Sequence, residues 1–551
     1  MAGSPALPIP MLTASDLMSR GLFHDRIIPP LSSVSLAGAM QGILDFAAND
    51  RVLYKNGKWH TKVTTKCVRH SYPKMKLARR ILSIPHPRNQ IFLALEIEKH
   101  WPELLTLCKR STISLTTPKL SAKRALEGSY ERRAEGVERA IRSVGQRYVV
   151  HADLARFYPS IYTHSIPWSI HGKSFRNDRG NDLYGNLIDL WVRQTQSAQT
   201  GGLPVGPDTS YLIAEMIASG IDHELGNAVG SLRGTRYIDD YHLYFSSRFK
   251  AEKALSELHK ISSVYELDIN DLKTSIQEIP ESMEPDWKTQ LRCVHLVARD
   301  HSTSFKAIFD LASSLAASFP QDGVFTYLAK KINAVVGKLD LGESDWLILE
   351  SLLLRSAVGE PAALPTILRI FEEHHRVPES AAAALNSICI HHSGLQQSSE
   401  VAWAMWSAKR LGTALSEEAA AAVAMVDDDI VALVALDLRE NHLLPTPSGG
   451  FAAWSSHMTT EGLYSEHWLL AYEASVKDWL PSVTGQDYVT NDPYFSLLRD
   501  SGVSFYDTSD VEMPDEGGYE EEDDYEDDDE DDEEDDEDPK LPSMNLFGGQ
   551  L

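Results

Sequence analysis

The stretch RYIDDYHLYF, residues 236–245, places two adjacent aspartates between aromatic and branched residues. Tyr237, Ile238 and most of residues 241–245 favour β-strands, and a pair of acids between two such runs is typical of the tip of a hairpin. An ordinary turn would explain Asp239 and Asp240. The alternative is a metal site, which needs a third carboxylate from another part of the chain.

A candidate for that carboxylate lies in RYVVHADLARFYPSIYTHSI, residues 147–166, where Asp153 ends a run that favours a strand. A strand end and a hairpin tip can bring Asp153 and Asp239 together if their strands are neighbours. Nucleotidyl transfer by two metal ions needs carboxylates that converge on ions about 4 Å apart, and magnesium prefers such oxygen ligands. We therefore interpret Asp153, Asp239 and Asp240 as a candidate site for two Mg²⁺ ions.

Two further segments complete the pattern. The stretch GGLPVGPDTSYLIAEMIASGIDHEL, residues 201–225, predicts a glycine-rich turn followed by an amphipathic helix. In it, Gly206 lets a backbone approach a nucleotide or base closely, and Ser210 lies near the helix start, where capping residues are favoured. In LDINDLKTS, residues 267–275, Lys273 could reach a triphosphate and protonate the leaving pyrophosphate.

The order DLARFY, GLPVGPDTS, YIDD and LDINDLKT is similar to motifs A, B, C and D of reverse transcriptases. The second motif resembles that of the bacterial "unknown group" and abortive-infection (Abi) reverse transcriptases in particular. The resemblance covers about residues 60–285. It implies an α/β (α+β) fingers–palm polymerase domain, followed by an all-α helical-repeat domain in place of a usual thumb. It also implies DNA synthesis in bacterial anti-phage defence.

The resemblance assigns roles to individual residues. It implies that Asp153, Asp239 and Asp240 bind the two Mg²⁺ ions. It also implies that Phe157 and Tyr158 contact the incoming nucleotide, and that the Tyr158 ring lies under the sugar, where it would clash with a 2′-hydroxyl. Deoxynucleotides are then the expected substrates. Basic side chains of the fingers would hold the triphosphate, and the candidates are Arg79, Arg80 and Arg88.

Val205 distinguishes this chain from templated reverse transcriptases, which often carry glutamine before the glycine of this motif. We therefore expect template-independent synthesis. Priming from a hydroxyl of the protein is an option, for which Tyr519 and Tyr525 are candidates, although nearby acids would repel a triphosphate. The first alternative is an RNA-templated enzyme with a cognate noncoding RNA. The second is a non-catalytic nucleic-acid-binding protein, against which the complete set of acids argues.

The charge of the chain is unevenly distributed. The net charge of the chain is −27, and twenty of its acidic residues lie among the 24 residues from Asp515 to Asp538. Residues 51–150 instead hold 22 Lys and Arg against 7 Asp and Glu. This excess suits a polyanion such as nucleic acid, although a solvated basic surface also explains it.

The expected partners are dNTPs, a DNA product and, in the templated alternative, a noncoding RNA. The resemblance alone implies a homo-oligomer.

The cysteines and the hydropathy pattern restrict the class of protein. The four cysteines lie far apart, without a CxxC pair, which argues against a zinc–cysteine site and a disulfide scaffold. Reduced thiols and the absence of an evident signal peptide favour a cytoplasmic location. We expect no membrane span, because no run of 18 apolar residues occurs. We interpret His391 and His392 as helix-end residues rather than as a metal-binding pair.

Changes in composition divide the 551 residues into four regions. Within the basic region, the apolar spacing from Ile91 to Leu107 predicts a helix. The third region is rich in Ala and Leu at helical spacing, and either an irregular solenoid or a plain bundle fits it. Dense like charge predicts disorder in the fourth. The regions are a lead-in with short helices at 1–50, fingers and palm at 51–290, an α-helical domain at 300–500, and an acidic tail at 508–551.

Overall fold

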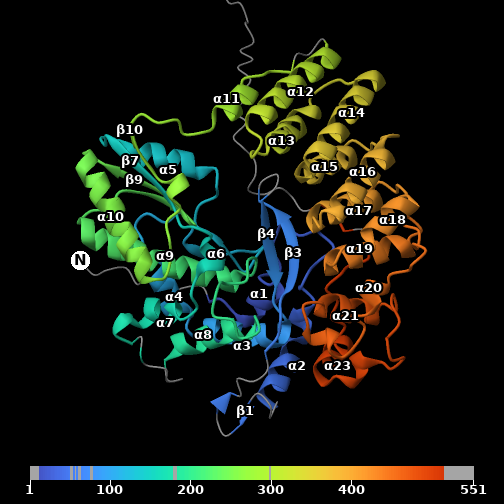
Figure 1. Cartoon of the computed structure of the whole chain (residues 1–551), viewed down its shortest axis with the longest axis horizontal. Helices are drawn as coiled ribbons and strands as arrows, with labels where there is room; N and C mark the ends of the chain where they lie inside the picture. Colours follow the sequence, from blue (N-terminus) through green and yellow to red (C-terminus); the bar gives the residue numbers. More distant parts are fainter. Residues whose placement is uncertain are drawn as a thin grey trace, which may run out of the picture.

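The computed structural model of the chain describes residues 11–49, 54–55, 58–59, 64–74, 78–175, 177, 183–296, 300–509 and 511–513 (Figure 1). The chain has a mixed α/β structure. A four-stranded sheet with its helices lies on one side, and a long series of helices lies on the other (Figure 1). A two-stranded hairpin lies between these two parts.

The four-stranded sheet carries the acidic motifs, and all its neighbouring strands are antiparallel. Helix α10 (Arg248–Val264) contacts β7 and β9, α5 (Ala134–Ser143) contacts β8 and β9, and the sheet lies between them (Figure 1). Helix α9 (Asp208–Val229) is buried along most of its length and packs on α10. Strand β7 pairs with β9 along its whole length, so the strands that carry Asp153 and Asp240 are neighbours. The strand order is β10-β7-β9-β8, with β7 Tyr148–Asp153, β8 Gly234–Tyr237, β9 Asp240–Phe245 and β10 Ser275–Glu278.

The segment from Ile91 to Leu107 forms two helices rather than one. Helix α3 (Pro87–Lys99) ends at His100, where α4 (Trp101–Cys108) begins. The reason is Pro102, which is tolerated in the first turn of a helix but not in its interior. The other short elements of this half are β1 Tyr54–Lys55, β2 Lys58–Trp59, β5 Pro118–Leu120, β6 Leu126–Gly128, α6 Phe157–Ser160, α7 Ser165–His171, η1 Lys173–Phe175, α8 Tyr184–Gln194 and η2 Asp271–Lys273.

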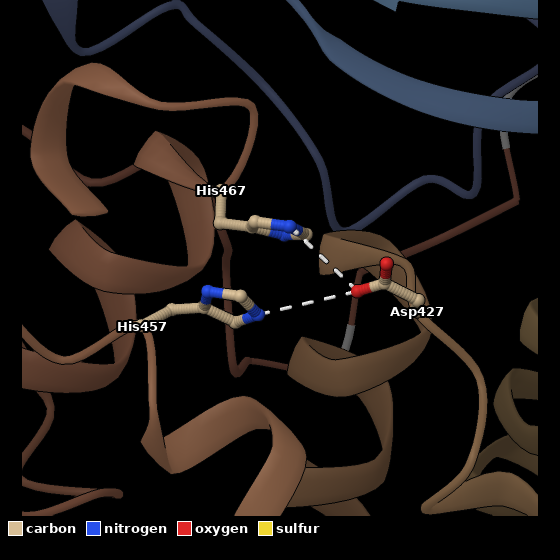
Figure 2. Close-up of side chains that lie close together, drawn as sticks. All are labelled: Asp427, His457 and His467. Atoms are coloured by element: carbon tan, nitrogen blue, oxygen red, sulfur yellow. Dashed lines mark ion pairs between the residues drawn. The ribbon is translucent and has the colours of Figure 1, made fainter. Parts of the chain in front are cut away.

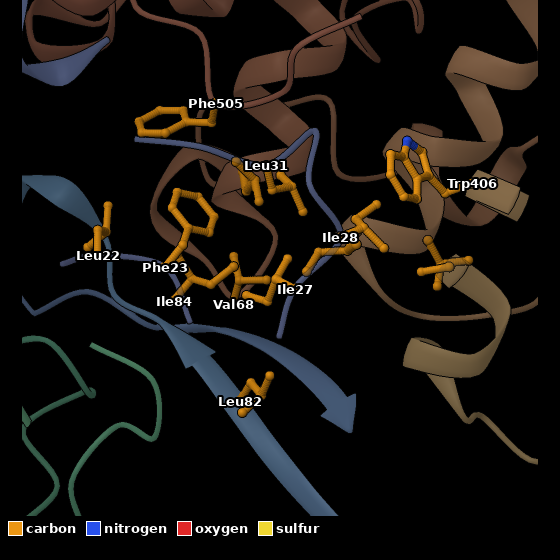
Figure 3. Close-up of a cluster of buried hydrophobic side chains, with 14 of the residues drawn as sticks. Leu22, Phe23, Ile27, Ile28, Leu31, Val68, Leu82, Ile84, Trp406 and Phe505 are labelled. Carbon is orange, nitrogen blue, oxygen red and sulfur yellow. The ribbon is translucent and has the colours of Figure 1, made fainter. Parts of the chain in front are cut away.

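The hairpin of β3 (Val68–Pro73) and β4 (Arg79–Ile84) joins the two halves of the molecule. It packs on α17 (Ser398–Arg410) and α19 (Asp429–Glu440) of the helical half. Figure 3 shows the apolar side chains at this junction, which come from the N-terminal segment, the hairpin, the helices and the C-terminal end. Its labelled residues are Leu22, Phe23, Ile27, Ile28, Leu31, Val68, Leu82, Ile84, Trp406 and Phe505. A continuous hydrophobic core therefore extends through both halves.

The helical half consists of antiparallel helices in two rows. Helices α12, α14, α16 and α18 contact one another in turn, and so do α13, α15, α17 and α19. Each of α12–α17 therefore packs on the helix two positions further along the chain. The remaining bounds are α11 Asp286–Arg292, α12 His301–Ser318, α13 Val324–Val336, α14 Glu343–Gly359, η3 Pro361–Ala363, α15 Leu364–Glu373, α16 Ala381–Gly394, α18 Glu417–Val423, α20 Ala452–Ser455, η4 Gly462–Tyr464, α21 Trp468–Val476, α22 Tyr488–Asn491 and α23 Pro493–Asp500.

The N-terminal lead-in packs against the end of the helical half. It contains α1 (Ala14–Ser19) and α2 (Leu36–Asn49), and α2 packs on α23. The backbone of Ser32 donates a hydrogen bond to the carbonyl of Phe505 at 2.9 Å. Residues 11–49 therefore share the core of the C-terminal helices.

The prediction that the disordered tail begins at residue 508 is wrong for its first residues. Lys409 Nζ donates to the carbonyl oxygen of Thr508 at 3.0 Å, and Arg410 Nη1 donates to that of Val511 at 2.8 Å. Met513 packs against the hydrophobic core. The dense acidic run, with Tyr519 and Tyr525, lies outside the described residues. Among the described helices, none is both long enough and apolar enough to cross a bilayer.

Candidate functional site

The two adjacent aspartates lie at the tip of the β8–β9 hairpin. Tyr237 pairs with Asp240, which leaves Ile238 and Asp239 as a two-residue loop. Ile238 has a positive φ of 59°, a conformation that is costly for a β-branched residue. The backbone at this turn is therefore strained, and the surrounding structure must hold it in place.

The buried side chain of Arg236 stabilises this turn. Its Nη1 donates to the carbonyl oxygen of Ile238 at 2.8 Å, and the Ile238 N–H donates to Thr116 Oγ1 at 3.3 Å. Arg236 also pairs with Glu215 and Asp222 of α9, each at 2.7 Å. The side chain of Arg236 is fully buried, so these bonds form in a medium of low dielectric constant, where they are strong and costly to break.

The pKa values of the two acids reflect this pairing. Burial acts to raise the pKa of Glu215, but the charge of Arg236 and hydrogen bonds from Ser114 and Thr116 outweigh it and hold the pKa below its usual value. Burial raises the pKa of Asp222, against the charge of Arg236. Helix α9, which follows the glycine-rich motif, is thus fixed to the aspartate turn through one arginine.

Three carboxylates meet beside this turn. Asp153, at the end of β7, lies opposite Asp240 in the register of β7 and β9, and the Leu154 N–H donates to the carbonyl of Asp239 at 3.1 Å. One carboxylate oxygen from each of Asp153, Asp239 and Asp240 lies within 4.8 Å of the others. The structure thus brings together the three acids that the motifs single out.

Their mutual repulsion changes their protonation. Burial and the negative charge of Asp239 raise the pKa of Asp240 to about 7, helped by its hydrogen bond with Asp153. Burial and the charge of Asp153 also raise the pKa of Asp239. Burial opposes ionisation of Asp153 too, but hydrogen bonds from Lys273 and Asn270 lower its pKa. Three ionised carboxylates so close together need positive charge between them, and their oxygen atoms are the ligands that magnesium prefers.

Lys273 is the cation that contacts these carboxylates. Its Nζ lies 2.8 Å from Asp153 Oδ2, and Asn270 Nδ2 donates to Asp153 Oδ1 at 3.1 Å. Both residues come from the LDINDLKTS segment, whose turn η2 is fixed by a hydrogen bond from the Asn270 N–H to the Asp153 carbonyl at 2.8 Å. The side chain of Lys273 is 43% exposed, so it can reach a bound ligand. The sequence pattern did not single out Asn270 as a site residue, although it lies in the LDINDLKTS segment.

Of the three candidate arginines, Arg80 is the one whose charge acts on the carboxylates. The positive charge of Arg80 acts on both Asp239 and Tyr158, and its side chain is exposed. Arg79 points to the opposite side of β4, where it pairs with Glu400 of α17 and donates through Nε to Ser71 Oγ at 2.9 Å. The prediction that any of the three arginines could hold a triphosphate is therefore wrong for Arg79.

It is also wrong for Arg88. Its Nη1 donates to the hydroxyl of Tyr464 at 3.1 Å, and its guanidinium lies 5.4 Å from the centroid of that ring and 5.8 Å from that of Phe46. These contacts fix the start of α3 to the helical half. Arg79 and Arg88 therefore serve the junction between the two halves.

The aromatic pair after Asp153 splits between the core and the site. Phe157 is buried in the hydrophobic core, so it cannot contact a substrate as expected. Tyr158 is half-buried, and burial and the negative charges of Asp239 and Glu215 raise the pKa of its hydroxyl. The hydroxyl of Tyr158 therefore stays neutral, within range of the charge of Asp239.

The glycine-rich turn has a structural role that the sequence did not reveal. Gly206 has a φ of 135°, and a Cβ there would lie 3.4 Å from the Ser83 carbonyl oxygen and from His24 Cβ. The conformational freedom of Gly206 therefore lets its backbone pass close to Ser83 and His24 of the same chain. The neighbouring Val205 carbonyl accepts a hydrogen bond from the Ser83 N–H at 2.8 Å, which joins this turn to β4.

The expectation of a capping role for Ser210 is wrong. Ser210 lies inside the first turn of α9 and is buried, whereas Pro207 occupies the N-cap position and makes no side-chain bond. Asp208, from the same motif, instead accepts from Arg124 Nε at 3.0 Å and from the Leu126 N–H at 3.0 Å. The charge of Arg124 also partly opposes the rise in the pKa of Tyr158, and the sequence pattern did not single out this arginine.

The basic excess of residues 51–150 is partly neutralised within the protein. Arg139 pairs with Glu281 at 3.1 Å and Arg142 with Glu138 at 2.7 Å, in addition to the pairs of Arg79 and Arg124. Among the described residues of this region, these basic side chains stay exposed: Lys66, Arg69, Lys74, Arg80, Lys99, Lys109, Arg110, Lys119, Lys123, Arg132, Arg133 and Arg147.

Comparison with known proteins gives little beyond this geometry. No protein-family profile and no curated protein matches the chain. Solved structures similar to it include telomerase from Candida albicans in complex with a TWJ fragment of telomeric RNA, at a TM-score of 0.28, 10% identity, and coverage of 64% of this chain and 65%, just under two thirds, of that chain. Apo telomerase from Candida tropicalis is similar at a TM-score of 0.31 and 10% identity, over 75% of this chain and 73% of that one. Because both TM-scores are low, functional reasoning has to rest on the site itself.

Proposed function

We propose that this protein is a nucleotidyltransferase of the reverse-transcriptase type that extends DNA from dNTPs. The observation that carries the proposal is the meeting of Asp153, Asp239 and Asp240 on adjacent strands, with Lys273 bonded to one of them. Burial and neighbouring negative charge raise the pKa values of Asp239 and Asp240, and such perturbed carboxylates are typical of functional sites.

The carboxylates would hold two magnesium ions. When bound, such ions activate a 3′-hydroxyl and neutralise the charge of the triphosphate. Asp240, with a pKa of about 7, would be held ionised by a bound cation. Lys273, bonded to Asp153 and part-exposed, would be placed to donate a proton to the leaving pyrophosphate.

Two further side chains would select and hold the nucleotide. Arg80 is exposed and its charge acts on Asp239, which suits a contact with the triphosphate. The ring of Tyr158 would exclude a 2′-hydroxyl by a steric clash, and the effect of the Asp239 charge on its pKa supports a position near the site. Arg124 positions the segment behind Tyr158 through its pair with Asp208.

Template-independent synthesis remains our preferred form of the activity. Val205 is bonded through its backbone to Ser83, and its apolar side chain offers no hydrogen bond to a template base. A role in bacterial anti-phage defence and priming from a protein hydroxyl belong to the same proposal and rest on the resemblance of the four motifs. The alternatives are synthesis templated by a bound noncoding RNA, and nucleic-acid binding without catalysis.

The first experiment offers each labelled dNTP singly to the purified full chain with magnesium, without template or primer. Products are separated on a denaturing gel before and after proteinase treatment. A ladder from one dNTP that shifts on digestion supports untemplated, protein-primed synthesis. Activity that needs all four dNTPs and is lost on RNase treatment supports the templated alternative.

The decisive variant is Asp239→Asn, compared with Asp310→Asn as a matched control. Both remove one carboxylate charge, but Asp310 is an exposed residue of α12 in the helical half. We expect Asp239→Asn to abolish incorporation and Asp310→Asn to retain it. Equal activity of the two variants would overturn the proposed nucleotidyl transfer, and unchanged phage protection by Asp239→Asn in cells would favour binding alone.

A further inference from the structure

A second group of metal-ligating side chains lies in the helical half. Asp427 precedes α19, His457 follows α20, and His467 precedes α21. Figure 2 shows that both imidazole rings point toward one carboxylate: His467 Nε2 lies 3.7 Å and His457 Nε2 lies 4.0 Å from Asp427 Oδ1. The two rings stack with their centroids 3.7 Å apart. Three segments of the chain thus present two ring nitrogens and one carboxylate to a common point.

A buried carboxylate behind His467 fixes which of its nitrogens faces that point. His467 Nδ1 lies 2.9 Å from Asp429 Oδ1, and Asp429 Oδ2 accepts the Leu470 N–H at 3.0 Å. Because Nδ1 donates its proton to Asp429, the lone pair of the neutral ring lies on Nε2. A carboxylate behind a histidine in this way is a regular feature of metal sites, where it orients the ring and increases its basicity.

We propose that Asp427, His457 and His467 bind a divalent transition-metal ion of the zinc class. Two imidazole nitrogens and one carboxylate oxygen are a ligand set that zinc accepts, whereas magnesium prefers oxygen atoms alone. Zinc bonds of about 2.0–2.1 Å in a tetrahedron separate the ligand atoms by about 3.3 Å. From the present separations of 3.7 Å and 4.0 Å, Asp427 Oδ1 would approach the two Nε2 atoms by about 0.4 Å and 0.7 Å, and the His457 ring would turn out of its stack on His467.

The exposure of the ligands allows this adjustment. The side chain of Asp427 is 73% exposed and that of His457 27%, so both can move and the remaining coordination position is open to water. The backbone of Asp427 is held by a hydrogen bond from its N–H to Gln396 Oε1 at 3.2 Å. The site thus combines an anchored His467 with two adaptable partners.

The position of the group suggests what the ion would do. The next residue, Asp428, forms a buried pair with His70 of β3 at 2.9 Å, and Glu466 pairs with Lys66 at 2.6 Å. The segments that the metal would join are therefore the ones that contact the hairpin bearing Arg80. A bound ion would stabilise the junction of the two halves, and its existence does not depend on the proposed polymerase activity.

The test uses the full chain, stripped with a chelator and dialysed against buffer with one equivalent of zinc. We expect about one zinc per chain to be retained and the melting temperature to rise by several degrees. Asp427→Asn and His457→Gln should lose both effects, and Asp427→Asn is an exposed change that should leave the fold intact. His391→Gln, an exposed histidine at the end of α16, is the matched control and should retain both effects.

A second readout separates this site from the carboxylates at the aspartate turn. Cobalt in place of zinc should give the intense visible absorption of a four- or five-coordinate ion with nitrogen ligands. The band should persist in an Asp153→Asn, Asp239→Asn double variant and vanish in His457→Gln. No retained zinc, or equal retention by wild type and His457→Gln, would overturn the proposal and leave an ion pair between histidine and Asp427 in its place.

Discussion

Replacing Arg236 by methionine tests how the aspartate turn is held. Arg236→Met keeps much of the side-chain volume but leaves Glu215 and Asp222 buried without their cation. Breaking a buried ion pair from one side costs about 3–5 kcal/mol, and the lost hydrogen bond to the Ile238 carbonyl adds about 1 kcal/mol. Against a typical stability of about 5–15 kcal/mol, this change removes a large part of the free energy of unfolding.

The loss should depend on pH in a defined direction. The charge of Arg236 lowers the pKa of Glu215. Without that charge, burial raises the pKa of Glu215 above its value in the unfolded chain. The folded variant then binds a proton more tightly than the unfolded chain, so its stability falls as the pH rises through the raised pKa. Urea unfolding followed by circular dichroism should show a larger gap between variant and wild type at pH 8 than at pH 5.

Two comparisons decide the reasoning. Arg248→Met removes an exposed arginine of α10 that pairs with Glu252 and should cost less than about 1 kcal/mol. A triple variant with Arg236→Met, Glu215→Gln and Asp222→Asn should recover most of the stability, because no charge is left buried, but not the activity, because Ile238 has lost its anchor. Equal unfolding midpoints for Arg236→Met and Arg248→Met would refute the reasoning.

Three further predictions concern the site and the junction. In the presence of a chelator, the raised pKa of Asp240 should make the free energy of unfolding fall between about pH 4 and pH 7; Asp240→Asn should weaken this dependence in urea titrations, and an unchanged profile would contradict it. Tyr158→Ala should reduce the preference for dNTPs over rNTPs by about tenfold or more, measured as the ratio of kcat/KM values, while an unaltered ratio would exclude a gating role. Arg79→Met should destabilise the chain by about 2–3 kcal/mol by leaving the buried Glu400 unpaired, and Glu400→Gln in the same chain should restore part of the loss in urea unfolding.

Local patterns were enough to predict several elements. The aspartate hairpin, the strand that ends at Asp153 and the helix after the glycine-rich turn all follow from residues close in sequence, since strand and helix periodicity and turn chemistry act over a few residues. The composition of residues 304–479 likewise predicts helices. These segments also contain the acids that form the candidate site.

The residues that each side chain contacts could not be predicted from the sequence. Arg79, Arg80 and Arg88 look alike in sequence, but Arg79 pairs with Glu400 and Arg88 bonds to Tyr464, whereas Arg80 is exposed and its charge acts on Asp239. Phe157 and Tyr158 are likewise adjacent in sequence, but Phe157 is buried in the core and Tyr158 is only half-buried. Each of these outcomes depends on segments that meet only after folding.

The sequence by itself determined the types of elements and the chemistry of the acidic motifs, because both depend on neighbouring residues. Only the tertiary structure decided that Arg236 supports the aspartate turn, and that Asp427, His457 and His467 share one point. Burial and ion pairing act between groups that are close in space, whatever their distance along the chain. The strength of those contacts depends on the low dielectric constant of the folded interior, which no local pattern in the sequence specifies.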